Sequence, residues 1–155
     1  MSPFDGLRIP RDLVCEFFAT FARFEFAIKE VGLRKQSGRR AEPDWWAFAT
    51  SASVAMRLDQ GSPLDAAIGR LIGEPPMVQL RDGQWSRDPL RGTTPIEQAF
   101  DAVSRLRNNL FHGGKHAPHS PDGRDEGLVR DALLVLTSYF EFDDNFRAVF
   151  EQTEF

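Results

Sequence analysis

The sequence predicts an all-α protein, an up-and-down bundle of four to five helices with a small irregular or hairpin insertion between the third and fourth. Apolar residues recur at three- and four-residue spacing in several separate stretches, which is the pattern of amphipathic helices. The connections between these stretches are short and polar, which favours packing of sequential helices against one another. The chain has 155 residues and 41% hydrophobic content, so we expect one core and a single domain over residues 1–155.

The first two helices are predicted from their apolar residues. The first runs from about residue 11 to residue 33, and its core face is formed by Val14, Phe17, Phe18, Phe21, Phe24 and Ile28. Residues 34–40 contain four cations and no acid, so we expect a loop there. A second helix follows from residue 45 to about residue 58.

The third helix and the insertion are predicted from turn and capping residues. Ser62 is a suitable cap, and Pro63 suits the first position of a helix that ends near Gly73. In the segment 74–92, Asp82-Gly83 lies between two short apolar pieces, which indicates a small hairpin or an ordered loop.

The last two helices carry the clearest start signals. Thr94 and Glu97 form the pattern of a capping box at the start of a helix over residues 95–112. Its core face is expected to comprise Ile96, Phe100, Val103, Leu106 and Leu110. Gly113-Gly114 ends it, and a loop follows. The final helix is predicted from about residue 125 to residue 150, with a core face of Leu128, Leu133, Leu136 and Phe140.

Composition narrows the classes of function. The net charge of −4 argues against a protein that coats nucleic acid, although it permits a local basic patch. The single cysteine, Cys15, excludes an internal disulfide and a multi-thiolate metal site, and we expect it to be a small buried residue. Neither a signal peptide nor a membrane span is evident. We therefore expect a cytoplasmic protein.

The segment from Arg107 to His112 contains the most reactive set of side chains. Asn108 and His112 are four residues apart and are neighbours on a helix surface, so the amide can orient the imidazole. Arg107 and His112 lie about 140° apart around the axis and about 7.5 Å apart along it. One helix therefore presents both to one phosphate only if its last turn unwinds at Gly113-Gly114, and two helices across a two-fold axis do so more easily. The motif thus indicates a symmetric dimer with a composite site.

These groups suit metal-free cleavage of RNA. A base with a pKa near neutrality must accept the proton of the attacking 2′-hydroxyl, and His112 fits this role. A forked cation must stabilise charge on the phosphoryl oxygens, and Arg107 fits this one. Lys115 is a candidate second phosphate contact. The loop cations Arg34, Lys35, Arg39 and Arg40 are candidate RNA-backbone contacts, although a solvated loop without function explains them equally well.

Ordinary structural roles explain many of the same residues. A histidine at a helix C-terminus is favoured by the helix dipole alone, and an arginine often covers an apolar stripe with its methylenes. Glu25 is either a buried partner of Arg107 or an ordinary glutamate that faces solvent or pairs with Arg23. Base stacking and helix packing are both open to the three tryptophans, Trp45, Trp46 and Trp85. His112, His116 and His119 do not share a helical register, so no metal site and no cofactor is expected.

Two segments resemble the HEPN family (higher eukaryotes and prokaryotes nucleotide-binding domains). Residues 107–112, Arg-Asn-Asn-Leu-Phe-His, are similar to its Arg-x4-6-His signature, including the polar residue directly after the arginine. Residues 21–29, Phe-Ala-Arg-Phe-Glu-Phe-Ala-Ile-Lys, look like the aromatic-rich first helix of bacterial members. The order of the helices agrees as well. The segment 74–92 and the acidic C-terminus have no counterpart that we map onto the family.

The resemblance implies a helical bundle, usually dimeric, whose paired motifs line a cleft between protomers. It implies a metal-independent endoribonuclease with Arg107 and His112 as the catalytic pair and Asn108 as the supporting polar residue. Toxin–antitoxin, anti-phage and RNA-processing roles are known in the family, so an antitoxin or regulatory protein is an expected partner. The alternative is a non-catalytic HEPN module that binds a nucleotide or a partner. A third reading is a helical interaction protein unrelated to nucleic acid.

Overall fold

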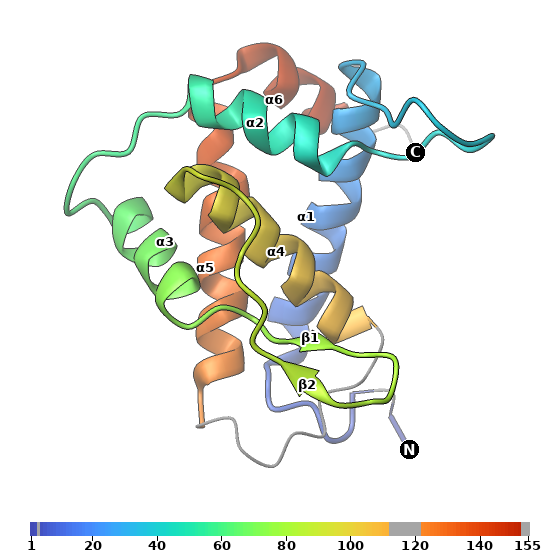
Figure 1. Cartoon of the computed structure of the whole chain (residues 1–155), viewed down its shortest axis with the longest axis vertical. Coiled ribbons are helices and arrows are strands. Elements are labelled where there is room, and N and C mark those ends of the chain that lie inside the picture. The colour runs from blue at the N-terminus through green and yellow to red at the C-terminus, as the bar shows by residue number, and fades with distance from the viewer. Residues whose placement is uncertain (3, 112–121, 153–155) are drawn as a thin grey trace.

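The all-α prediction is confirmed by a computed structural model that describes residues 1–2, 4–111 and 122–152. Within these ranges the chain forms a helical bundle with one two-stranded sheet (Figure 1). The helices are α1 Arg11–Glu30, α2 Trp45–Ala55, α3 Pro63–Gly73, α4 Pro95–Phe111, α5 Arg124–Ser138 and α6 Asp144–Glu151. The short strands are β1 Val78–Gln79 and β2 Trp85–Ser86, and a 3-10 turn, η1 Tyr139–Glu141, precedes α6.

An aromatic cluster joins the helices at the core. The ring of Phe24 on α1 is fully buried and contacts Phe48 on α2 and Phe146 on α6 at centroid distances of 5.5 and 4.7 Å. The apolar face predicted for α4 is confirmed, since four of its residues are buried and Leu110 packs against the core. Burial of these rings stabilises the bundle through the apolar area removed from water.

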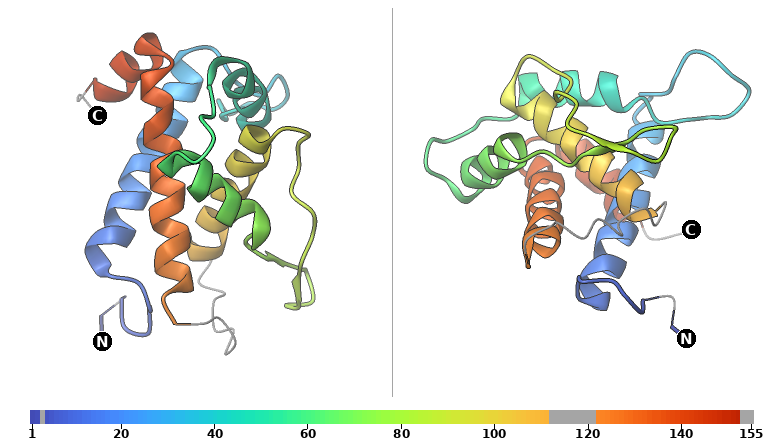
Figure 2. Two further views of the ribbon diagram at one scale, coloured as in Figure 1. Left: turned by 90° about the vertical axis from the view of Figure 1, so that its left-hand side faces the viewer. Right: turned by 60° about the horizontal axis from the view of Figure 1, so that its bottom comes forward.

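The loop between α1 and α2 is anchored at its base. The backbone N–H of Asp44 donates to the carbonyl of Leu33 at 2.9 Å, and its carboxylate accepts from the N–H of Ala47 at 2.9 Å. Asp44 therefore closes the loop and caps α2. Figure 2 shows the loop, coloured light blue to teal, extending away from the helices between these fixed ends.

The predicted hairpin exists and is tied to α4. Val78 pairs with Ser86, and Gln79 pairs with Trp85, in antiparallel register. Gly83 adopts a φ of +84°, which the turn requires and which glycine tolerates. We call residues 74–94, from the end of α3 to the start of α4, the strap. The chain leaves α3, forms the hairpin beside α4 and returns along α4 before that helix begins (Figure 1).

Side chains of α4 hold the strap in place. The Asn109 amide donates to the carbonyl of Met77 at 2.8 Å. The Arg105 guanidinium donates to the carbonyls of Asp88 and Pro89 at 2.7 and 2.5 Å. The helix that contains Arg107 therefore also holds the strap in its position.

Several details of the sequence prediction were wrong. The last predicted helix is divided at residues 139–143, because the Asp143 carboxylate accepts the N–H of Phe146 at 2.8 Å and starts a new helix. Cys15 is exposed rather than buried, because it lies on the outer side of α1 between Val14 and Phe17. The first two helices end at Glu30 and Ala55, about three residues earlier than predicted. Among the described residues, no helix is both long and apolar enough to cross a membrane.

Candidate functional site

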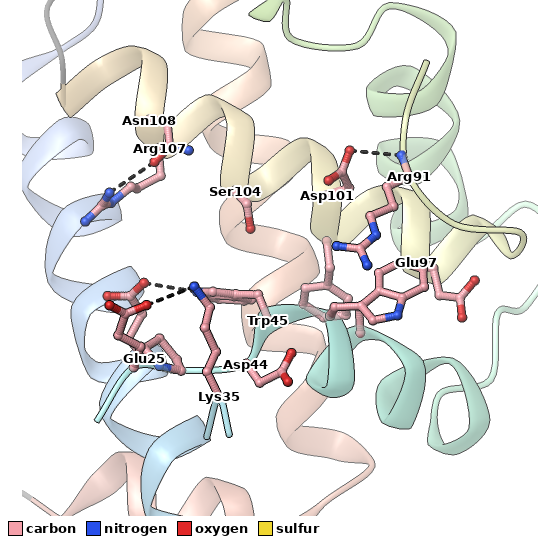
Figure 3. Close-up of a pocket in the computed structure, with 15 residues that line it drawn as sticks. Glu25, Lys35, Asp44, Trp45, Arg91, Glu97, Asp101, Ser104, Arg107 and Asn108 are labelled. Atoms are coloured by element: carbon pink, nitrogen blue, oxygen red, sulfur yellow. Dashed lines mark hydrogen bonds and ion pairs between the residues drawn. The ribbon is translucent and has the colours of Figure 1, made fainter. Parts of the chain in front are cut away.

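An open groove of about 890 Å³ lies between α4 and the first turns of α2. We call it the α2–α4 groove. Residues of the 35–43 loop border it on one side, and Arg91 of the strap borders it on another. One face of α4 supplies much of the lining, because its contributing residues recur at helical spacing: Glu97, Phe100, Asp101, Ser104, Arg107 and Asn108. Figure 3 shows Arg107 and Asn108 at one end of the groove, with Arg91 and Asp101 toward the other.

Arg107 and Asn108 act as a pair. One guanidinium nitrogen of Arg107 donates to the Asn108 amide oxygen at 3.0 Å (Figure 3). The guanidinium carbon lies 5.5 Å from the centre of the Phe21 ring and 4.8 Å from that of Phe111. Two aromatic rings and one amide therefore position this cation at the edge of the groove. A guanidinium has five N–H donors, and among the described residues one hydrogen bond of this guanidinium is seen, the one to Asn108.

The predicted partner of Asn108 falls outside the described residues. His112 and Lys115 both belong to the segment 112–121, about which the structure provides no description. Arg107 and Asn108 are therefore the described members of the predicted catalytic set. Since the Asn108 amide oxygen accepts from Arg107, its NH2 group is the part that remains to orient a neighbour.

Asn109 has a structural role that its identical neighbour does not share. Its side chain is buried, with 8% of the residue exposed, and its amide NH2 group donates a hydrogen bond to the Met77 carbonyl. Asn108 is exposed. Asn108 thus lines the groove, whereas Asn109 attaches the strap to α4.

Three of the carboxylates that line the groove accept hydrogen bonds that stabilise the fold. Asp44 caps α2, and Glu97 accepts from the backbone N–H groups of Thr93 and Thr94 at 2.8 and 3.1 Å. These hydrogen bonds hold the pKa of Glu97 below its ordinary value. Asp101 accepts from the Arg91 N–H at 3.0 Å and pairs with Arg105 at 2.9 Å. The groove therefore contains more acidic than basic side chains, and the carboxylates of Asp44, Glu97 and Asp101 accept hydrogen bonds within the fold.

Glu25 and the cations of the loop after α1 differ in their partners and in their relation to the groove. Glu25 accepts from the indole N–H of Trp45 at 3.0 Å, so the hydrogen-bond partner that the described residues give it is a tryptophan rather than Arg107. Lys35 lines the groove and pairs with Glu42 at 2.9 Å, which raises the pKa of this lysine. Arg34 pairs with Glu30 at 3.6 Å. Arg39 and Arg40 are exposed and do not line the groove.

The adjacent tryptophans have different environments. Trp45 is half-buried and stacks on Phe21 at 4.7 Å, which makes it a packing residue as well as part of the groove wall. Trp46 is 36% exposed, and the Arg91 guanidinium lies 4.0 Å from its ring centre. Trp85 belongs to β2 and does not line the groove. The sequence did not indicate Arg91 or Ser104 as site residues. Arg91 reaches the groove only through the tertiary fold, whereas Ser104 shares a face of α4 with Arg107 and Asn108 at three- and four-residue spacing.

Two guanidinium groups of the groove lack a carboxylate partner within the described residues. Arg107 bonds to an amide, and the Arg91 guanidinium stacks on Trp46. In the same part of the chain, no group of three or more His, Cys, Asp or Glu side chains is arranged to hold a metal ion. Comparisons with protein-family models, with curated proteins and with solved structures found no match.

Proposed function

We propose that this protein is a metal-independent endoribonuclease of the HEPN type. The observation that carries the proposal is the position of Arg107 and Asn108 at the edge of an open groove, five and four residues before His112 in the chain. Arg107 has no carboxylate partner among the described residues, so its charge is available to a phosphate.

The proposed reaction assigns one role to each residue. His112 accepts the proton of the 2′-hydroxyl while the 2′-oxygen forms a bond to the adjacent phosphorus. The bond from phosphorus to the 5′-oxygen breaks, and that oxygen becomes a hydroxyl after it takes up a proton. Arg107 stabilises the charge on the phosphoryl oxygens, and Asn108 orients Arg107 and His112. The products are a 2′,3′-cyclic phosphate and a 5′-hydroxyl end.

We also propose that two copies form the active unit. The exposed Phe111 ring lies beside the motif, 6.2 Å from the Phe18 ring, so an apolar surface adjoins Arg107. Association through this surface would bring two copies of the motif together, which the spacing of Arg107 and His112 in the sequence favours. A toxin or anti-phage effector controlled by an antitoxin or regulatory protein is the proposed biological role.

Cleavage in the presence of EDTA tests the proposal. Purified protein and RNA should yield cyclic-phosphate ends, and His112→Ala should abolish them. His116→Ala is the matched control, since it removes a nearby imidazole that lies outside the motif. Equal loss in both variants, or unchanged cleavage by His112→Ala, would contradict the role of His112.

A non-catalytic module is the second candidate. The observation in its favour is that Arg107 is held between two aromatic rings, which suits a stable ligand contact as well as a reaction. In that case RNA or a nucleotide should bind without turnover, and Arg107→Ala should weaken binding. Induced expression in growing cells separates the two further, since toxicity that His112→Ala relieves indicates the enzyme.

A further inference from the structure

The end of the α2–α4 groove distant from Arg107 contains a second cation on an aromatic surface. The Arg91 guanidinium lies 4.0 Å from the Trp46 ring centre, within the range of a stacked cation–π contact. Both residues line the groove, and Trp46 is exposed at its surface. Both residues are exposed, and within the part of the chain that the structure describes the Arg91 guanidinium has no carboxylate partner.

The backbone that presents Arg91 is fixed. Its N–H donates to Asp101 at 3.0 Å. The next residue, Gly92, has a φ of +115° and lies so close to α4 that an added Cβ would be 2.5 Å from Cβ of Glu97. This approach requires glycine, because another residue would clash and would be strained. Arg91 is therefore held against Trp46 by the path of the strap.

We propose that Trp46 and Arg91 form a stacking subsite for an unpaired base of the RNA that Arg107 holds by its phosphate. The base stacks on the guanidinium plane, which itself stacks on the indole. Arginine planes and aromatic rings are the surfaces on which proteins stack splayed-out RNA bases. This inference rests on the proposed function. It specifies the class of substrate as RNA that has an unpaired base near the cleaved bond.

Local charge favours a base rather than a second phosphate at this subsite. Glu97 and Asp101 line the groove beside Arg91, and Asp44, which caps α2, also lines it (Figure 3). The carboxylates of Glu97 and Asp101 oppose the approach of a phosphate at this end. A neutral base avoids that repulsion, and its N–H groups can donate to carboxylate oxygens.

The spacing along α4 fits neighbouring parts of one RNA strand. Asp101, which holds Arg91, precedes Arg107 by six residues, or about 9 Å along the helix axis. Ser104 lies between them, and its hydroxyl points into the groove (Figure 3). This hydroxyl is placed to bond the sugar–phosphate backbone that joins the two subsites. In a duplex the base would remain stacked on its neighbours, so a double strand does not satisfy both contacts.

The test separates base stacking from phosphate binding by removing the bases alone. The probes are fluorescein-labelled oligoadenylate of about 16 nucleotides, the upper end of known single-strand site sizes, and an abasic ribose-phosphate oligomer of equal length. Both carry the same charge. Binding is measured by anisotropy with full-length His112→Ala protein, which prevents cleavage of the probe.

The His112→Ala protein is the parent in which the further substitutions are made. We expect this parent to bind oligoadenylate about ten-fold more tightly than the abasic oligomer. That ratio should fall severalfold in Trp46→Ala and Arg91→Ala, and Trp46→Phe should restore part of it. Arg87→Ala, which removes an exposed cation of the strap outside the groove, is the matched control and should leave the ratio unchanged. Thermal unfolding shows whether each variant remains folded.

The outcomes distinguish this inference from the proposed nuclease. A ratio near one in the parent, or an unchanged ratio in folded Trp46→Ala, overturns the stacking subsite even if the wild-type protein cleaves RNA. A ratio that depends on Trp46, without cleavage by the wild-type protein, supports the subsite and contradicts the nuclease. Failure of both oligomers to bind contradicts both proposals.

Discussion

At the scale of single residues, the two adjacent asparagines of α4 show how one helix serves both the groove and the fold. Asn108 is exposed and bonds to Arg107, whereas Asn109 is buried and bonds to Met77 of the strap. Neighbours on a helix point about 100° apart, so identical side chains reach different surroundings. The sequence indicated a role for Asn108 alone, and the structural role of Asn109 emerged only from the tertiary fold.

We expect Asn109→Ala to destabilise the protein by about 1–3 kcal/mol, because it leaves the Met77 carbonyl without its partner. In a chain of this length each kcal/mol lowers Tm by about 2–4 °C. Asn108→Ala should change Tm little, because the side chain is exposed, yet lower RNA cleavage. Thermal unfolding and cleavage rates of the two variants check this division. A larger loss of stability in Asn108→Ala would contradict it.

The contribution of Arg107 to the rate of cleavage should depend on the shape of its side chain as well as on its charge. Arg107→Ala should slow cleavage by about 100-fold or more, the usual effect of removing a donor to developing oxyanion charge. Arg107→Lys keeps the charge but loses the planar fork and the fit between Phe21 and Phe111, so an intermediate rate is expected. Single-turnover rates at saturating protein measure the effect. Equal rates for lysine and arginine would show that a point charge suffices.

At the scale of elements, local signals predicted the starts of α3 and α4 because capping depends on neighbouring residues. Ser62 accepts the Asp65 N–H at 3.1 Å, and Thr94 and Glu97 exchange the hydrogen bonds of a capping box. The break before α6 was missed because apolar residues recur at four-residue spacing through Phe142, Phe146 and Phe150. The pairing of the strap with α4 joins residues far apart in sequence, which periodicity does not report.

The cap of α4 should make the free energy of unfolding decrease as the pH falls into the acidic range. The folded-state pKa of Glu97 is lowered by the N–H groups of Thr93 and Thr94, so the unfolded chain takes up its proton first as pH falls. The stabilisation is complete above the unfolded-state pKa and is lost as pH drops through the folded-state pKa. Denaturant unfolding across this acidic range should therefore show a shallower pH dependence in Glu97→Gln.

Another helix cap provides the control for that measurement. Ser62→Ala removes a cap from α3 without removing a titrating group, so it should cost about 1 kcal/mol at every pH. Its pH dependence should stay parallel to that of the wild-type protein. If Glu97→Gln also runs parallel, the cap of α4 does not contribute to acid sensitivity.

At the scale of the whole molecule, the fold brings together a groove that no single element contains. Residues of α1, α2, α4, the 35–43 loop and the strap all line it. The sequence predicted the α4 part, since Arg107 and Asn108 lie within one motif. Arg91 and Trp46 are 45 residues apart by their numbers and meet only through tertiary packing, so spacing rules did not connect them.

Self-association is the property of the whole molecule that the composite site requires. We expect light scattering to give about twice the 17.5 kDa mass of one chain. Phe111→Glu should shift the protein to monomers, because it places a charge on the exposed ring beside Phe18 and Arg107. Val54→Glu is the matched control, since Val54 is 85% exposed on α2 and does not line the groove.

The cleavage rate then decides whether the second copy belongs to the active site. If each groove needs the partner's motif, folded Phe111→Glu monomers should lose cleavage, and raising their concentration should restore it as dimers re-form. Val54→Glu should remain dimeric and active at all concentrations. Monomers that cleave RNA at the wild-type rate would show that one chain supplies both Arg107 and His112 to the same phosphate. The last turn of α4 would then have to depart from regular helical geometry, since a regular helix holds these residues about 140° apart.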